Sequence, residues 1–374
     1  MNRRISLGLA ALVLFLITSL CPAATQRWTA DQANDWYKNQ PWLVGSNFIP
    51  STAINELEMW QADTFDLPTI DKELGWAERL GFNTVRVFLH NLPWKQDAVG
   101  FVDRIDQFLR VADTHHIKVM FVLFDACWDP YPKLGKQHEP RQGVHNSGWV
   151  QAPGREYLED RSRWGELEAY AGGVVRRFKD DPRIVAWDVF NEPDNTNDSS
   201  YGKEEPKNKP AIVQQLLKEV FQWCRYADPS QPLTSGVWRG TWGDPQKLSP
   251  MERLQLGESD VISFHCYAKL PTMKEAVENL RRYNRPLFCT EYMARPMGST
   301  FETILPFLKE QKVAAYNWGF VAGKTNTIYP WDSWQHSYET EPQVWFHDIF
   351  RADGTPYSPQ EVQTIKAITG KGQT

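Results

Sequence analysis

Two glutamates stand at the ends of short apolar runs in the sequence. The run IVAWDVFNEP places Asn191 and Glu192 directly before Pro193, and the run PLFCTEY carries Glu291 next to its last residue. If both runs are strands of one barrel, their carboxyl ends meet at the same rim, and the two carboxylates face each other across its mouth. Such a pair suits the hydrolysis of an acetal, because one group protonates the leaving oxygen while the other meets the developing oxocarbenium ion.

The elements that would position these residues follow a regular pattern along the chain. Short apolar runs rich in β-branched residues recur, each followed by a polar turn and most by an amphipathic stretch. Continuous apolar runs of this length are typical of parallel strands that are covered on both faces. The predicted strands are residues 42–50, 83–90, 117–125, 184–192, 232–238, 261–267, 286–292 and 313–320.

Helices are predicted between most of these strands. Residues 69–81 end in a glycine stop, and residues 101–116 and 211–227 repeat apolar side chains at helical spacing. An unbroken series of eight strand–helix units predicts an α/β fold, a single-domain (β/α)8 TIM barrel. Shorter helix candidates are residues 162–178, 272–284, 300–311 and 358–368, and the weakest is 244–257.

The carboxyl ends of the eight predicted strands carry an unusual set of polar and aromatic side chains. In a barrel of this kind the active site forms at this rim. A rim without a function would carry one or two such groups as loop caps, whereas this one carries Asn47, Arg86, His90, Asp125, Asn191, Glu192, Trp238, His265, Tyr267, Glu291 and Trp318.

Two of the predicted loops, residues 126–161 and 321–357, are long and bear several tryptophans. Loops of this length in a compact domain are usually functional, and an indole ring suits the flat apolar face of a sugar. The alternative for their polar residues is ordinary solvation. We predict substrate-binding residues in these loops and at the rim beside them, namely Trp128, His145, Asn146, Trp149 and Lys324, with Trp238 and Trp331 as further candidates.

Five motifs in chain order, NTVRV, WDVFNEP, HCY, CTEY and NWG, lie on the expected strands. Together they make the chain resemble the clan A retaining glycoside hydrolases, most of all the cellulase-like family 5, over essentially its whole length after residue 24. The resemblance implies Glu192 as general acid/base and Glu291 as nucleophile. It also implies hydrolysis of a β-linked polysaccharide or oligosaccharide, of the β-glucan or β-mannan type, by double displacement.

The same resemblance gives the remaining motif residues their expected roles. Asn191 binds the sugar 2-hydroxyl, and Trp318 stacks under the sugar in the catalytic subsite, where the alternative is a core tryptophan. His265 and Tyr267 orient the carboxylates. Glu192 requires a raised pKa, whereas Glu291 stays ionised beside Tyr267 and Arg86, unless Arg86 forms only a structural ion pair.

One departure from the family pattern concerns the end of the third strand. The family often shows a histidine there, whereas this chain reads FDACWDP, with Asp125 and Trp128. Either His145 or His90 could replace that histidine from a loop.

The N-terminal segment and the composition predict the location and partners. Residues 1–24 have a basic start, an apolar stretch and small residues before a cleavage point, as in a signal peptide, with a membrane anchor as the alternative. We therefore expect a secreted or periplasmic catalytic domain over residues 25–374, monomeric and not held by a membrane. Net charge is −5 without a basic run, which argues against nucleic acid. No metal or cofactor motif is present, and the cysteines after Cys21 are interpreted as small buried hydrophobes, with Cys266 and Cys289 unpaired.

Three alternatives to the leading function stay open at this point. The enzyme could act at chain ends, because the two long loops could block one end of a cleft. A carbohydrate-binding barrel that has lost catalysis would be expected to lack one carboxylate, and both are present. A surface protein that binds another protein through its tryptophans would leave the ordered rim residues unexplained.

Overall fold

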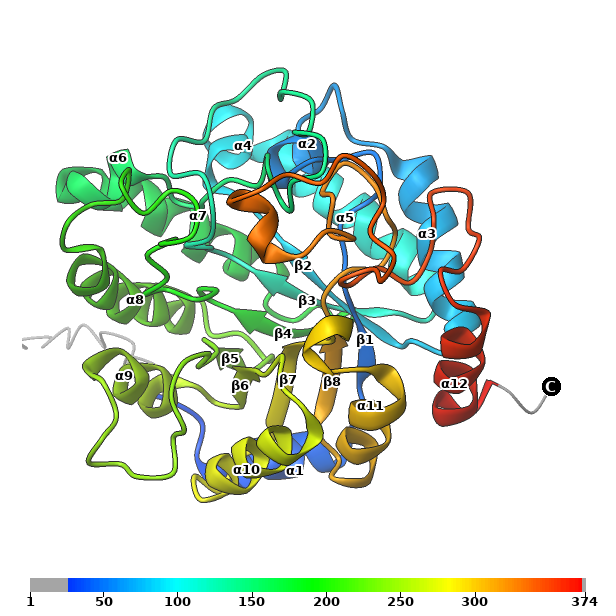
Figure 1. The fold of residues 1–374 in the computed structure, drawn as a ribbon. Coiled ribbons are helices and arrows are strands. Elements are labelled where there is room, and N and C mark those ends of the chain that lie inside the picture. Colours follow the sequence, from blue (N-terminus) through cyan, green and yellow to red (C-terminus); the bar gives the residue numbers. More distant parts are fainter. Residues whose placement is uncertain (1–25, 372–374) are drawn as a thin grey trace, which may run out of the picture.

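The computed structural model describes residues 26–371, which form one eight-stranded parallel barrel (Figure 1). Every strand lies inside a predicted run. The neighbour order is β5-β4-β3-β2-β1-β8-β7-β6, and a parallel bridge from Val237 to Phe264 joins the two ends of this series. The strands are β1 Val44–Asn47, β2 Thr84–Phe88, β3 Lys118–Val122, β4 Ile184–Asp188, β5 Leu233–Thr234, β6 Ile262–His265, β7 Leu287–Tyr292 and β8 Ala314–Asn317.

Within residues 26–371, eight helices surround the barrel and confirm the predicted pattern. In α3, Asp66 accepts a hydrogen bond from the backbone of Thr69 at the start, and Gly81 ends the helix in a left-handed conformation. The weakest helix prediction, residues 244–257, corresponds to the short helix α9. This helix begins after a capping box at Ser249. The helices are α3 Leu67–Leu80, α5 Ala98–Thr114, α7 Trp164–Phe178, α8 Lys209–Tyr226, α9 Pro250–Glu258, α10 Leu270–Arg281, α11 Phe301–Glu310 and α12 Pro359–Thr369.

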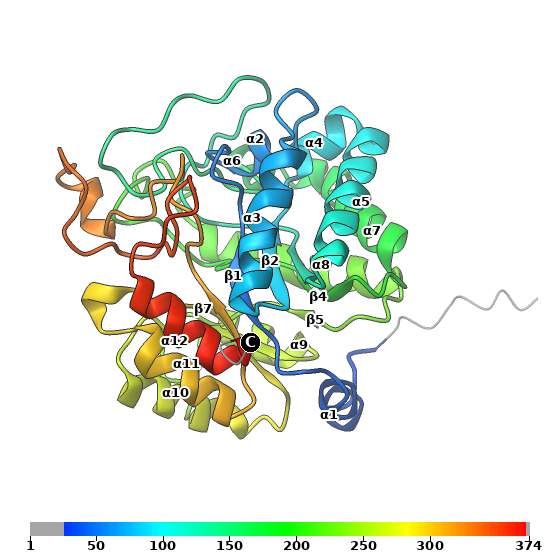
Figure 2. The same cartoon turned by 90° about the vertical axis from the view of Figure 1, so that its right-hand side faces the viewer.

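Four further helices in the described part of the chain were not predicted. Helix α1 (Ala30–Lys38) lies at the amino-terminal end of the barrel, where Trp36 and Tyr37 pack against the side chains that fill the barrel interior, such as Phe288 (Figure 2). The other three are short and belong to the loops after β1, β2 and β3, namely α2 Glu56–Trp60, α4 Asn91–Gln96 and α6 Arg155–Glu159. These three helices form part of the loops at the carboxyl-terminal rim of the barrel.

The long loops after β3 and β8 are joined to each other by hydrogen bonds. The Asn146 amide donates to the Thr325 carbonyl (2.8 Å), the Trp334 indole N–H donates to the His145 carbonyl (2.8 Å), and the His145 amide donates to the Ser333 hydroxyl (3.0 Å). We call residues 141–149 together with residues 323–338 the loop wall.

The loop wall rests on the segment that follows β1. Asn55 donates to the Gly148 carbonyl (2.8 Å), and the Lys324 amide donates to the Ser51 carbonyl (3.1 Å). In the sheet, β3 and β8 are separated by β2 and β1. The joined loops therefore cover the part of the rim that belongs to β1 and β2.

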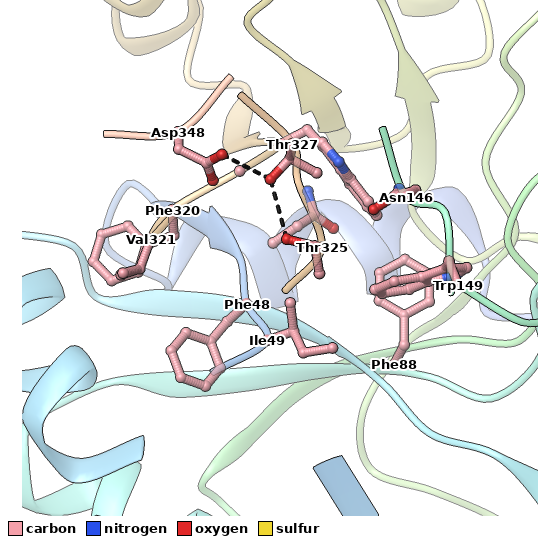
Figure 3. Close-up of a pocket in the computed structure, with 13 residues that line it drawn as sticks. Phe48, Ile49, Phe88, Asn146, Trp149, Phe320, Val321, Thr325, Thr327 and Asp348 are labelled. Carbon is pink, nitrogen blue, oxygen red and sulfur yellow. Dashed lines mark hydrogen bonds between the residues drawn. The ribbon is translucent and has the colours of Figure 1, made fainter. Parts of the chain in front are cut away.

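A small cavity lies where the two loops meet, between Asn146 and the pair Thr325 and Thr327 (Figure 3). Its volume is about 20 Å³, which holds about one water molecule. Thr327 donates a hydrogen bond to Asp348 (2.7 Å) at its edge. The contact between the loops is therefore packed almost without space.

The predicted signal peptide, residues 1–24, lies outside the described residues, so it and the predicted export stay predictions. Within residues 26–371, no helix is long and apolar enough to cross a membrane. Cys266 and Cys289 are both unpaired, as expected.

Candidate active site

A cleft of about 680 Å³ opens at the carboxyl-terminal rim. Such a volume lies in the range of pockets that bind small molecules. The loops after β3 to β8 contribute side chains to it. The predicted residues that line this cleft are Trp128, His145, Asn146, Trp149, Asn191, Glu192, His265, Tyr267, Glu291 and Trp318.

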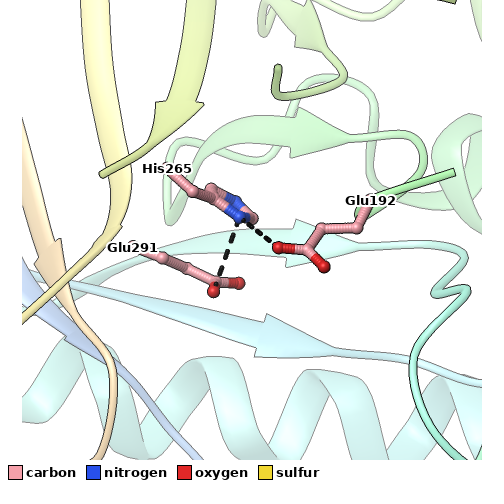
Figure 4. Close-up of side chains that lie close together, drawn as sticks. All are labelled: Glu192, His265 and Glu291. Carbon is pink, nitrogen blue, oxygen red and sulfur yellow. Dashed lines mark hydrogen bonds and ion pairs between the residues drawn. The ribbon is translucent and has the colours of Figure 1, made fainter. Parts of the chain in front are cut away.

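Glu192 and Glu291 both approach the Nδ1 atom of the His265 ring (Figure 4). The His265 Nδ1 atom is 2.8 Å from Glu192 Oε1 and 3.5 Å from Glu291 Oε2. One oxygen of each carboxyl group and one ring nitrogen lie within 4.8 Å of one another. Burial lowers the pKa of His265 to about 4, so the ring is neutral at neutral pH.

Glu291 is surrounded by strong hydrogen-bond donors. Arg86 Nη1 lies 3.0 Å from its Oε1, and the Tyr267 hydroxyl donates to its Oε2 (2.7 Å). Arg86 is fully buried and also pairs with Asp188 at the end of β4 (2.7 Å). Burial raises the pKa of Glu291, and the charge of Arg86 acts against this rise.

Besides the neutral ring of His265, Glu192 has only neutral donors. Asn195 donates to its Oε2 (2.7 Å), and the Cys127 thiol donates to the same oxygen (3.4 Å). Burial raises the pKa of Glu192. A positively charged donor stabilises a carboxylate more than a neutral one does, and Glu291 has such a donor in Arg86 whereas Glu192 has none among the described residues.

The backbone of Glu192 is also unusual, with φ at +41°. Residues other than glycine rarely adopt positive φ, and such conformations cluster at functional sites. The strand has ended four residues earlier, at Asp188, so the sharp turn before Pro193 aims the carboxyl group into the cleft.

Asn191 is held in one orientation by partners at both ends of its amide. Its Oδ1 accepts from Arg86 Nη2 (2.7 Å), and its Nδ2 donates to Asp125 (2.9 Å). Asp125 in turn accepts from the Trp149 indole N–H (2.7 Å). Burial raises the pKa of Asp125 to about 6. The network ties β2, β3 and β4 together directly beneath the cleft.

Trp318 forms an aromatic surface beside the carboxylates. It is half-buried and makes edge-to-face contacts with Phe88 and Trp149, each with ring centres 5.7 Å apart. Trp149 is only 2 % exposed and uses its N–H on Asp125, so it supports Trp318 more than it offers a face of its own. A rigid, supported indole of this kind suits stacking against a sugar ring.

The family model of cellulase, glycosyl hydrolase family 5, matches residues 53–337. The chain belongs to glycosyl hydrolase family 5. This family consists of glycoside hydrolases, and the matched residues include both glutamates and all the side chains that hold them.

The individual protein compared first shares little sequence identity with this family 5 chain. Mannan endo-1,4-beta-mannosidase 8 of Oryza sativa subsp. japonica is 24 % identical over 217 residues, which cover 53 % of this chain and 54 % of that protein. The chain thus spans about half the length of this curated relative.

Solved structures share the fold at low identity. An exo-beta-1,4-mannosidase from Opitutaceae bacterium strain TAV5 has a TM-score of 0.56 and 18 % identity, covering 88 % of this chain and 60 % of that one. A beta-1,4-mannanase from the sea hare Aplysia kurodai has a TM-score of 0.53 and 15 % identity, covering 74 % of this chain and 87 % of that one.

Two of the predicted site residues of this family 5 chain, Lys324 and Arg86, do not line the cleft. Lys324 pairs with Glu58 on α2 (2.7 Å) and thus holds the loop wall in place. Arg86 lies beneath the cleft, where it contacts Glu291 and Asn191.

The histidine that the family often shows after β3 has no direct replacement. His90 is buried and accepts a hydrogen bond from the Leu92 amide at the start of α4. His145 lines the cleft, but its Nδ1 contacts the Tyr329 carbonyl (2.8 Å), and burial lowers its pKa to about 4. Asp125 and Cys127 contact Asn191 and Glu192 instead.

Sequence reasoning missed three members of the site. Cys127 was interpreted as a small buried hydrophobe, and this was wrong, because it is only partly buried and its thiol contacts Glu192. Asp188 gave a usable signal, since it is a lone carboxylate inside an apolar strand and must have a buried cationic partner. Asn195 lies in an irregular loop, where no sequence period indicates which side chains point into the cleft.

Glu192, His265 and Glu291 are also the one group among the described residues with ligand atoms close enough to hold a metal ion. Their oxygens already accept hydrogen bonds from Arg86, Tyr267 and Asn195. The buried guanidinium, 3.0 Å from a Glu291 oxygen, would repel a cation placed there. The chemistry of this group therefore favours acid–base and nucleophilic roles.

Proposed function

We propose that the protein is a retaining β-glycosidase in which Glu192 is the general acid/base and Glu291 is the nucleophile. The observation that carries this proposal is the approach of the two carboxyl groups to within 4.8 Å. Retaining enzymes separate these groups by roughly 5 to 5.5 Å, whereas inverting enzymes need about 6.5 to 9.5 Å to admit a water molecule.

In the first step of the proposed reaction, Glu291 attacks the anomeric carbon and the bond to the leaving oxygen breaks. Glu192 donates its proton to that oxygen, so the leaving group departs as an alcohol and a covalent glycosyl–enzyme remains. Arg86 and Tyr267 keep Glu291 ionised and oriented for this attack. Asn191, fixed by Arg86 and Asp125, is positioned to bind the 2-hydroxyl of the same sugar.

In the second step, Glu192 has lost its proton and acts as a base. It takes a proton from water, whose oxygen attacks the anomeric carbon and releases Glu291. Two inversions at one carbon return the β configuration. The contrast between a nucleophile with a charged donor and an acid with neutral donors supports this division of roles.

We propose a β-mannoside as the preferred substrate. The rice relative and the two solved structures described above are all named for action on β-mannan or a β-mannoside. A β-glucan is the second candidate, because the family model is described as cellulase. The complete catalytic set argues against a barrel that only binds carbohydrate.

The first test of this function is hydrolysis of an aryl β-glycoside followed by proton NMR. We expect 4-nitrophenyl β-mannoside to be cleaved faster than the β-glucoside, with the β-anomer of the sugar appearing first. Initial release of the α-anomer would contradict the retaining mechanism. Failure to cleave any β-glycoside or β-linked oligosaccharide would contradict the function itself.

A second prediction concerns pH. Activity requires Glu192 protonated and Glu291 ionised, so kcat/KM should fall at alkaline pH as Glu192 loses its proton. Asn195 donates to the ionised carboxylate and lowers its pKa. The variant Asn195→Ala should therefore move the alkaline limb to higher pH, by about one pH unit or less.

The acid limb gives the internal control for this variant. This limb reflects the protonation of Glu291, which Asn195 does not contact. Its position on the pH axis should therefore not change. A shift of the alkaline limb to lower pH in Asn195→Ala would contradict the assignment of that limb to Glu192.

A further inference from the structure

The two glutamates divide the rim of the barrel into two parts. Glu192 follows β4 and Glu291 lies on β7. In the order of the sheet, β3, β2, β1 and β8 lie between them on one side, and β5 and β6 lie between them on the other. A sugar chain bound between the carboxylates therefore has one end over each part.

The sugar that Glu291 attacks belongs to the first part. Trp318 follows β8 and packs on Phe88 at the end of β2. Asn191, positioned for the 2-hydroxyl, is held by Arg86 of β2 and by Asp125 after β3. Under the proposed function, the glycone sugar lies on this side, and the leaving group extends toward β5 and β6.

The loop wall closes the glycone side. It covers the rim above β1 and β2. From there, Trp334 of the loop wall extends the covered part of the rim toward β4 through its contact with Trp128. Trp128 stacks on Trp334 with ring centres 5.3 Å apart, and Trp334 contacts Tyr201 of the β4 loop at 5.2 Å. Gln335 donates to the Ser199 carbonyl (2.7 Å). The loops after β3, β4 and β8 thus meet each other.

Within the described residues, the space behind Trp318 is small. The space there is the cavity of about 20 Å³ between the loops (Figure 3). Room for about one water molecule is far too small for a pyranose ring. Buried hydrogen bonds, such as that from the Asn146 amide to the Thr325 carbonyl, hold the loops together at this point.

The other side of the cleft is open and lined for a ligand. Trp238 after β5 is half-buried, its N–H donates to Asp194 (2.7 Å), and Arg239 lies over its ring at 4.0 Å. Arg239 itself is exposed. A fixed indole beside solvent suits an aglycone sugar.

We propose that the enzyme is exo-acting and removes one sugar at a time from the non-reducing end of a β-linked oligosaccharide. This inference rests on the proposed function and specifies its substrate. The loop wall limits the glycone subsite to a single terminal sugar, and the open side accepts the rest of the chain. Internal bonds of a polysaccharide are excluded because a chain cannot continue through the wall.

The experiment uses β-1,4-mannohexaose and cellohexaose, each labelled at the reducing end with a fluorophore. We expect labelled pentaose first, then tetraose, together with unlabelled monosaccharide, and no early fall in the viscosity of a soluble β-mannan or β-glucan. Early labelled di- or trisaccharide, or release of an unlabelled disaccharide, would overturn the inference while leaving the glycosidase function intact. Hydrolysis of neither series, nor of the aryl glycosides, would instead remove the function.

The loop wall is tested separately with Trp334→Ala, which removes the ring between Trp128 and Tyr201. We expect this variant to produce internal cleavage, with the ratio of labelled trisaccharide to pentaose rising about tenfold or more. Gln335→Ala, a smaller change in the same contact, should give a weaker shift in the same direction. A folded Trp334→Ala variant, judged by its thermal unfolding, that still releases only monosaccharide would contradict the role of the wall.

Trp238→Ala is the matched control at the open side. It should raise KM for the hexaose by about tenfold, while the position of cleavage stays at the non-reducing end. A change in the cleavage position in Trp238→Ala, with none in Trp334→Ala, would place the glycone on the opposite side and overturn the proposal.

Discussion

Replacing Glu291 by alanine is expected to abolish turnover of every substrate, with kcat reduced by on the order of 10⁵-fold. Without this carboxylate no glycosyl–enzyme forms, and no neighbouring group can replace it. Arg86 and Tyr267 would then donate to an empty position. The loss should be the same for a substrate with a good leaving group, because the missing step is the attack at the anomeric carbon.

The measurement is kcat for 2,4-dinitrophenyl β-mannoside and for the β-1,4-linked oligosaccharide. Glu204→Ala is the matched control, because Glu204 is an exposed glutamate in the β4 loop. It should retain normal activity. If Glu291→Ala kept more than about a hundredth of the activity, Glu291 would not be the nucleophile.

The fold was predictable because its repeating signal is local. Each strand lies inside an apolar run bounded by a polar turn, and each long helix has its own apolar stripe, so neither depends on distant contacts. The short helices α2, α4 and α6 were missed for the opposite reason. At five or six residues they are too short to show a helical period.

The part of the site carried by strand ends was predictable for the same reason. A closed barrel brings the ends of all its strands to one rim, so Arg86, His265 and Glu291 could be placed together from their order in the chain alone. The pairing of Arg86 with Glu291 also follows, because a buried arginine requires carboxylate partners, whereas its second partner, Asp188, was missed.

The contacts of the loop residues could not be predicted from the sequence, although several of the predicted loop residues do line the cleft. Trp128 and Asn146 both adopt positive φ, and such conformations are fixed by contacts between loops rather than by local preference. Lys324 shows the consequence. Its place in a long loop suggested a ligand contact, but Glu58, distant in the sequence, holds it in the loop wall.

The environment of Glu192 leads to a second large expected effect. Glu192→Ala should reduce kcat/KM for oligosaccharides by about 10² to 10⁴-fold, because their leaving groups need a proton. A dinitrophenyl glycoside should behave differently, since its leaving group departs without one. The glycosyl–enzyme should form and then accumulate, because no base activates water for its hydrolysis. A burst of dinitrophenolate followed by slow turnover is therefore expected.

Azide distinguishes the two glutamates by stereochemistry. It is an anionic nucleophile that needs no general base, so it should restore turnover of the dinitrophenyl substrate by Glu192→Ala and give the β-glycosyl azide. In Glu291→Ala, azide can only occupy the position of the lost carboxylate and attack the substrate directly, which gives the α-azide. The reverse pattern, an α-azide from Glu192→Ala and a β-azide from Glu291→Ala, would show that the acid and the nucleophile are exchanged. The partners of each group favour the first pattern, because the buried guanidinium of Arg86 contacts Glu291, whereas Glu192 accepts hydrogen bonds from the neutral groups of Asn195 and Cys127.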